Sequence, residues 1–97
     1  MRTETTEDGW RAFIKLCGQF NHPEELEELF DLFFTHEEKE ALSKRHDLVK
    51  ALLDEGMTQR EIAERLEVSI SKITRGSNAL KIISNKLKEA LKDIMAS

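Results

Sequence analysis

Apolar side chains recur at steps of three and four residues along the chain, a spacing that places them on one face of an α-helix. Trp10, Phe13, Ile14, Cys17 and Phe20 form the first such series. No segment alternates between apolar and polar residues in the way that predicts a strand. We therefore predict an all-α fold of six helices, which begin near residues 6, 23, 35, 58, 69 and 84.

Several of these predicted helices have capping residues at their ends. Segments 35–38 and 58–61 each begin with Thr and end with Glu, which fits the reciprocal hydrogen bonds of a capping box. Ser69 and Ser84 are suited to cap the last two helices. Gly56 follows the third helix, where glycine is typical of a left-handed C-cap.

The aromatic residues are confined to one part of the chain. The five Phe and the single Trp all lie in the first 34 positions. Two short helices cannot bury that much ring surface on each other. The rings either pack onto the rest of the same chain or interlock with a second copy. The length of 97 residues favours a second copy, because so short a chain buries little core alone.

The charge is distributed unevenly along the chain, although its net value is only −4. Residues 1–56 carry 7 Lys+Arg against 14 Asp+Glu, whereas residues 57–97 carry 8 against 5. No acidic residue lies between Glu67 and Glu89, a stretch that contains five of the lysines and arginines. This stretch is either a phosphate-binding face or the solvated side of ordinary helices.

Composition argues against several classes of protein. No apolar run reaches the roughly 18 residues of a membrane span, and the polar, acidic N-terminus does not resemble a signal peptide. Cys17 is the single cysteine, so we expect a reducing, cytoplasmic location. The three histidines lack metal-ligand spacing and the four glycines are dispersed. We expect no enzyme activity, no cofactor and no bound metal.

The clearest motif is "TQREIAERLEVSISKITR", residues 58–75. Ile62 and Leu66 would face inward on the first of two helices, and Ile73 would anchor the second. Val68 would anchor the connection, and Ala63 is small where the helices must approach closely. This spacing predicts a helix-turn-helix, with an ordinary helical hairpin as the alternative.

The second helix of such a motif enters the major groove with its N-terminal residues against base edges. Those residues are Ser69, Ile70, Ser71 and Lys72. Glu67 lies in the turn, where these motifs often have glycine. A non-glycine residue that adopts a positive φ there costs roughly 1–2 kcal/mol.

The segment "ITRGSNALK", residues 73–81, places weak helix formers inside a predicted helix. In this segment the chain resembles the Trp repressor family, and the resemblance extends from Trp10 to the end, without gaps from Thr35 to Lys81. It implies one domain over residues 1–97. Its expected parts are dimerisation helices in 1–56, a helix-turn-helix in 57–81 and a C-terminal helix in 82–97.

The resemblance also implies a fold and a function. Members form an intertwined all-helical homodimer that binds L-tryptophan and then operator DNA, and so represses tryptophan biosynthesis or uptake genes. On this basis we expect a tryptophan-dependent repressor. The alternatives are a helix-turn-helix protein without an effector or one that binds a different indole.

Four residues before the helix-turn-helix would hold the tryptophan. The backbone carbonyls of Leu32 and Phe34 would accept hydrogen bonds from its ammonium group. The Thr35 hydroxyl would help to hold its carboxylate, and Arg45 would cover one face of the indole. Surface ion pairing is the ordinary alternative for such an arginine.

Three residues of the "ITRGSNALK" segment would complete the pocket. Arg75 would pair with the carboxylate and stack on the ring. Gly76 would leave a slot for the flat indole, so a large residue there should abolish the response to the effector without unfolding the protein. Ala79 stands where well-known members have a serine whose hydroxyl assists the ammonium group.

DNA contacts would come from the starts of both helices of the motif and from the second helix itself. Arginine is well suited to guanine O6 and N7, and a serine hydroxyl or a lysine is suited to phosphate. The residues implied are Gln59, Arg60, Ser69, Ile70, Ser71, Lys72, Thr74 and Lys81.

Overall fold

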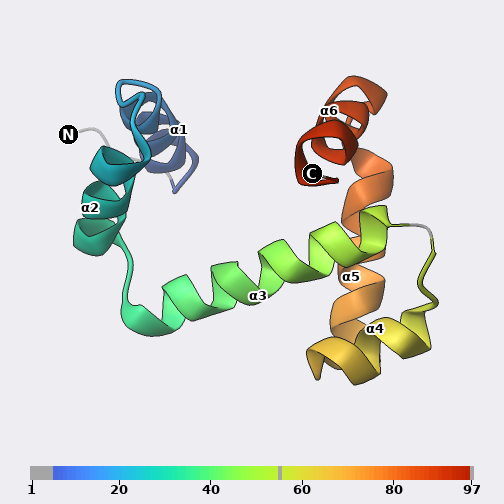
Figure 1. The fold of residues 1–97 in the computed structure, drawn as a ribbon. Coiled ribbons are helices and arrows are strands. Elements are labelled where there is room, and N and C mark those ends of the chain that lie inside the picture. Colours follow the sequence, from blue (N-terminus) through green and yellow to red (C-terminus); the bar gives the residue numbers. More distant parts are fainter. Residues whose placement is uncertain (1–5, 55, 97) are drawn as a thin grey trace. The chain divides into compact units, whose positions relative to one another are not determined.

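The computed structural model describes residues 6–54 and 56–96 and, within them, consists of helices without strands. The helices are α1 (Thr6–Cys17), α2 (Pro23–Phe33), α3 (His36–Leu53), α4 (Gln59–Leu66), α5 (Ile70–Ile82) and α6 (Asn85–Met95) (Figure 1). The predicted all-α architecture of six helices is therefore confirmed.

The chain divides into two compact units, one ending at His36 and the other beginning at Glu37. In the first unit, the ring of Phe13 on α1 packs against Phe30, Phe33 and Phe34 at centroid distances of 5.1–6.1 Å. These rings do not enclose one another. Trp10 is 59% exposed, Phe33 is 49% exposed, and α2 has no buried residue.

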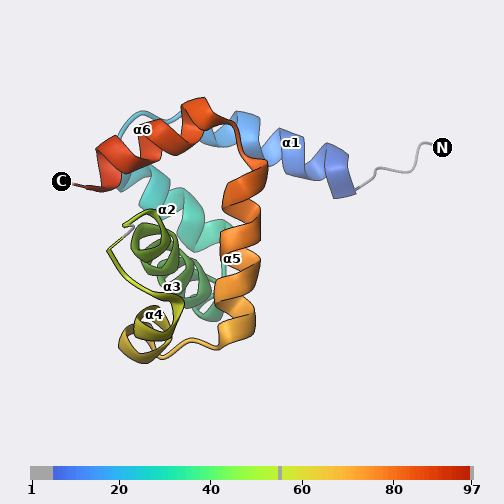
Figure 2. The same ribbon diagram turned by 90° about the vertical axis from the view of Figure 1, so that its right-hand side faces the viewer.

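The second unit has a small apolar core where α3, α4 and α5 meet (Figure 2). Leu48, Ile62 and Ile73, one from each helix, are almost completely buried. Around them pack partly buried side chains: Ala51, Leu52, Met57, Ala63, Leu66 and Val68. The inward positions predicted for the helix-turn-helix are confirmed by this cluster, and the motif is an α4–α5 pair joined by a short turn.

Local hydrogen bonds begin α4, α5 and α6 where the sequence predicts. The Thr58 hydroxyl accepts from the Glu61 amide at 3.2 Å, and the Glu61 carboxylate accepts from the Thr58 amide at 3.3 Å. The Ser69 and Ser84 hydroxyls each accept from the backbone amide three residues on, at 3.3 and 3.1 Å. Thr35 directly precedes α3, but the capping box of segment 35–38 stays a prediction.

The prediction of Gly56 as a left-handed cap is wrong. α3 ends at Leu53, and the Gly56 amide donates to the Asp54 carboxylate at 3.1 Å. An aspartate that bonds to the backbone two residues on offers the chain an alternative to a further helical turn. No glycine of the described residues has a positive φ. α1 also ends earlier than the apolar series that reaches Phe20.

Candidate functional site

A pocket of about 370 Å³ lies in the second unit, between α3, α5 and α6. It is lined by Arg45, Val49, Arg75, Gly76, Ala79, Leu80, Ile83, Leu87 and Leu91. Four of the seven predicted tryptophan-binding residues are thus brought together around one cavity. They come from two helices far apart in the sequence, α3 and α5.

The polar side chains of this pocket are both guanidinium groups, those of Arg45 and Arg75. A guanidinium can pair with a carboxylate through two parallel hydrogen bonds and can stack on an aromatic ring. The other lining residues are apolar or glycine. The pocket is therefore suited to a carboxylate attached to a flat apolar group, and its own lining side chains offer no acceptor to an ammonium group.

The three remaining predicted ligand residues belong to the first unit. Leu32 lies in the last turn of α2, and Phe34 and Thr35 lie between α2 and α3. Carbonyls in the last turn of a helix have no partner within the helix, so Leu32 is well placed to offer one as an acceptor. The roles of these three residues in ligand binding remain predictions.

Gly76 is buried where α5 approaches α3. A Cβ at this position would lie 3.0 Å from Leu52 Cδ1, 3.2 Å from Leu48 Cδ2 and 3.5 Å from an Arg45 guanidinium nitrogen. The missing side chain thus permits close packing of the two helices as well as lining the pocket. A large residue at this position would press on Leu48 and Leu52 and so lower the stability of the fold, a packing cost that the sequence alone does not predict. Its effect on the response to the effector stays a prediction.

The N-terminal part of α5 presents one face to solvent. Ile70 is 54% exposed, whereas Ile73, less than one turn further along, is fully buried. Ser71 and Lys72 are also exposed. The Thr74 hydroxyl donates to the Ile70 carbonyl at 3.0 Å, so its proton already has a partner on the helix. Ile70, Ser71 and Lys72 form an outward-facing group at the start of the helix, as predicted for base-reading residues.

The other predicted DNA contacts are exposed on the same two helices. Gln59 and Arg60 form the first turn of α4, Ser69 caps α5, and Lys81 lies near the other end of α5. The structure therefore places all eight predicted residues on the surface of the α4–α5 motif. Their contacts with DNA stay predictions.

Glu67 adopts the left-handed conformation at the end of α4, with φ 54° and ψ 45°. The turn position that glycine often occupies thus has a positive φ in this chain. The Val68 amide donates to the Ala63 carbonyl at 3.3 Å, which is the long bond of a Schellman motif around a left-handed residue. Glycine is usual in that position, and glutamate costs roughly 1–2 kcal/mol more in the left-handed conformation.

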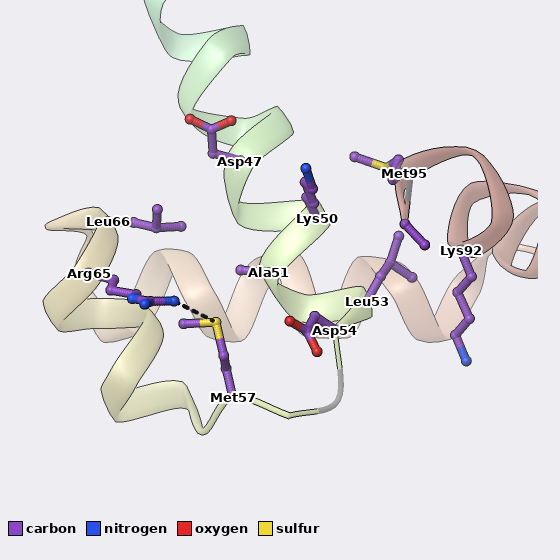
Figure 3. A pocket seen from close by; sticks show the side chains of 11 residues that line it. Asp47, Lys50, Ala51, Leu53, Asp54, Met57, Arg65, Leu66, Lys92 and Met95 are labelled. Atoms are coloured by element: carbon purple, nitrogen blue, oxygen red, sulfur yellow. Dashed lines mark hydrogen bonds between the residues drawn. The ribbon is translucent and has the colours of Figure 1, made fainter.

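A second, larger cavity of about 730 Å³ was not anticipated from the sequence (Figure 3). It lies between α3, α4 and α6, and two of its lining side chains are joined by a hydrogen bond from the Arg65 guanidinium to the Met57 sulfur at 4.0 Å. Acidic and basic side chains both line it, so its charge selects no particular class of ligand. None of the predicted site residues lines this cavity.

Two further findings concern metals and membranes. Among residues 6–54 and 56–96, no group of three or more His, Cys, Asp or Glu side chains is arranged to hold a metal ion. Within the same residues, no helix combines the length and the apolar character that a membrane crossing requires.

We predict that Gly76→Leu lowers the free energy of unfolding by about 1–2 kcal/mol. Overpacking against Leu48 and Leu52 costs typically 1–3 kcal/mol, and better helix propensity recovers somewhat less than 1 kcal/mol. Urea unfolding at one protein concentration measures the change. Asn78→Leu, at an exposed position of the same helix, should cause no loss. Equal stability of the Gly76 variant and the wild type would contradict the close α3–α5 contact.

Comparisons with known proteins agree with this architecture. Residues 8–95 match the sequence pattern of the family described as Trp repressor protein. The chain is 49% identical over 94 residues to the Trp operon repressor homolog of Chlamydia caviae, covering 97% of this chain and 93% of the relative. Identity to the homolog of Chlamydia trachomatis serovar D is 46%, and the match covers 88% of this chain and 90% of the relative. Identity to the homolog of Vibrio cholerae is 38%, and the match covers 89% of this chain and 84% of the relative. The chain therefore belongs to the Trp repressor family, a family of helix-turn-helix transcriptional repressors and not of enzymes.

Proposed function

We propose that this protein is an L-tryptophan-dependent repressor that binds operator DNA as a homodimer and controls genes of tryptophan biosynthesis or uptake. One observation carries the proposal: α5 contributes to the arginine-lined pocket and also presents the exposed residues expected to read DNA. A ligand in that pocket contacts the reading helix directly. The relatives named above as Trp operon repressor homologs support the identity of the ligand and the target.

The pocket chemistry suits the proposed ligand. The Arg75 guanidinium pairs with the carboxylate of tryptophan, and Arg45 covers a face of the indole ring. The ammonium group needs acceptors from elsewhere, which the carbonyls of Leu32 and Phe34 would supply. The Thr35 hydroxyl assists the carboxylate. L-Tryptophan acts here as a corepressor, and the protein has no cofactor in this proposal.

The homodimer is supported by the amount of apolar surface that one chain leaves exposed. Within the described residues, only Leu48, Ile62 and Ile73 are buried hydrophobic side chains. Large apolar residues such as Trp10, Phe33 and Leu32 are about half exposed or more. A core of this size is small for a domain of 97 residues. In the proposed dimer the helices of residues 1–56, which carry the aromatic side chains, interlock with those of a second copy and so cover that surface.

DNA binding relies on the exposed face of α4 and α5. Base edges are read by Ile70, Ser71 and Lys72 from the start of α5, while Arg60 is suited to guanine. Because the stretch from Glu67 to Glu89 contains no further acid, this part of the molecule attracts phosphate despite the net charge of −4. A protein of this function would act in the cytoplasm, where bacterial operator DNA lies.

The proposed mechanism is a shift between populations. A ligand can favour the DNA-binding state only by binding it more tightly than the other state. Tryptophan between α3 and α5 would hold the helix-turn-helix at the position that matches DNA. In a dimer the two reading helices must lie about one DNA turn apart, roughly 34 Å, as in other helix-turn-helix dimers, the Trp repressor among them.

The proposal is tested by measuring the affinity for DNA with and without L-tryptophan at fixed salt. The duplex is obtained by selection from a randomised pool in the presence of tryptophan. We expect tryptophan to tighten binding by about 5-fold to 150-fold, which corresponds to a coupling free energy of 1–3 kcal/mol. Unchanged affinity would contradict the mechanism, and calorimetry would then show whether tryptophan binds at all.

A second candidate, a repressor that responds to a different indole, is favoured by one residue. Ala79 lines the pocket and has no hydroxyl to accept a hydrogen bond from an ammonium group. An indole carboxylate that lacks the amino group would lose nothing there. Parallel calorimetric titrations with L-tryptophan and with indole-3-propionate distinguish the two ligands. Tighter binding of the propionate, together with DNA binding that depends on it, would favour this second candidate.

We predict that Ala79→Ser raises the affinity for L-tryptophan about tenfold. A hydrogen bond to a charged group contributes roughly 1.5–3 kcal/mol, and the low end applies because position 79 is exposed. Isothermal titration calorimetry measures the change. The affinity for indole-3-propionate, which has no ammonium group, serves as the control and should not rise. A parallel rise for both ligands would show that the serine acts through packing and not through the ammonium group.

We predict that Lys81→Ala lowers the slope of log affinity against log salt by about one unit, because one phosphate contact is lost. The loss should be nearly equal for selected and unrelated duplexes. Fluorescence anisotropy at four or more salt concentrations provides the slopes. Lys15→Ala on α1 removes the same charge outside the α4–α5 motif and is the matched control. An unchanged slope in the Lys81 variant would exclude the contact.

A further inference from the structure

Glu67 is the single non-glycine residue with a positive φ among the residues that the structure describes. It lies in the turn of the helix-turn-helix, between the end of α4 at Leu66 and the N-cap of α5 at Ser69. We propose that Glu67 is a positioning residue that weakens DNA binding in the absence of ligand and so makes repression more dependent on the effector. This inference rests on the proposed function.

The contacts on both sides of Glu67 force its conformation. The amide of Glu67 and that of Val68 both donate to the Ala63 carbonyl, which closes the end of α4. Val68 packs against the buried cluster of Ile62 and Ile73. Ser69 accepts from the Lys72 amide and begins α5. Strained backbone conformations persist where the surroundings determine them in this way.

The strain is present only while the turn is formed. States in which the hydrogen bonds to the Ala63 carbonyl open and α5 is released from α4 relieve it, so the strain lowers the fraction of molecules whose reading helix is correctly placed. The apparent affinity for DNA falls by that same fraction. A ligand that binds the placed state restores the fraction. Strain at Glu67 therefore weakens DNA binding more in the absence of ligand than in its presence.

The carboxylate of Glu67 adds a second, separable effect. Consecutive Cα atoms lie about 3.8 Å apart, so the Cα atoms of Glu67 and Ser69 are at most about 7.6 Å apart. This is close to the Debye length of about 8 Å at physiological salt. Glu67 is exposed and is the last acid before Glu89. Its charge should repel a phosphate bound near Ser69 equally with and without ligand.

Three variants separate the two effects. Glu67→Gln removes the charge and keeps the strain. Glu67→Gly removes both, and Glu67→Asn removes the charge with a side chain that tolerates the left-handed conformation without the flexibility of glycine. Glu64→Gln, on the exposed surface of α4 in ordinary helical conformation, controls for the loss of one nearby negative charge.

The test measures DNA affinity with and without saturating L-tryptophan, on the selected duplex, for the full chain. For Glu67→Gln we expect tighter binding by the same factor in both conditions, with less gain at higher salt. For Glu67→Gly and Glu67→Asn we expect a further gain of about threefold to tenfold without tryptophan and a smaller one with it. Their thermal midpoints should also exceed that of Glu67→Gln.

The proposal is overturned if Glu67→Gly, Glu67→Asn and Glu67→Gln share one ratio of affinities with and without tryptophan. It is also overturned if their thermal midpoints coincide. A different outcome identifies failure of the proposed function: wild-type DNA binding that ignores tryptophan. In that case the DNA affinities measured without tryptophan test the effect of strain at Glu67 by themselves. The glycine and asparagine variants must still bind DNA more tightly than the glutamine variant.

Discussion

The close crossing of α5 over α3 at Gly76 is the contact on which the second unit depends. Leu48 and Leu52 approach this position so closely that even a methyl group would press on them. Leu48 also belongs to the buried cluster with Ile62 and Ile73, while Gly76 lines the pocket beside Arg45 and Arg75. The core and the pocket therefore share one helix crossing. A change in the distance between α3 and α5 alters both, so a ligand bound in this pocket would act directly on the helix-turn-helix.

That link matters because the core is small. With three buried hydrophobic residues in the described chain, each contact is a large part of the total packing, and the α4–α5 motif is held by few side chains. Structures with few buried apolar contacts open locally at low free energy. Capping bonds at Thr58 and Ser69 keep the two helices individually formed. They do not fix the position of α5 against α3, so this position is the one that a ligand between the two helices can stabilise.

The sequence predicted those features that neighbouring residues determine. The capping box at 58–61 and the caps at Ser69 and Ser84 depend on hydrogen bonds between residues three apart in the sequence. The sequence did not predict the features that are determined by a competing hydrogen bond or by residues far apart in the chain. Asp54 ends α3 before Gly56 through its own carboxylate, and the packing role of Gly76 depends on leucines of another helix. The large cavity between α3, α4 and α6 has no local signature, because its lining residues are spread from Asp47 to Ala96.

We propose that the strained turn and a ligand in the pocket have opposite effects on the position of α5. In the proposed function Glu67 disfavours the placed state of the helix, whereas a carboxylate ligand bound by Arg45 and Arg75 would favour it. A ligand can switch DNA binding only if a substantial fraction of ligand-free molecules is outside the placed state. If nearly all molecules were already in that state, the ligand could not raise the fraction further. A relaxed turn would narrow that margin and make DNA binding less dependent on the ligand. A glutamate where glycine fits better is therefore consistent with a helix-turn-helix that needs its effector.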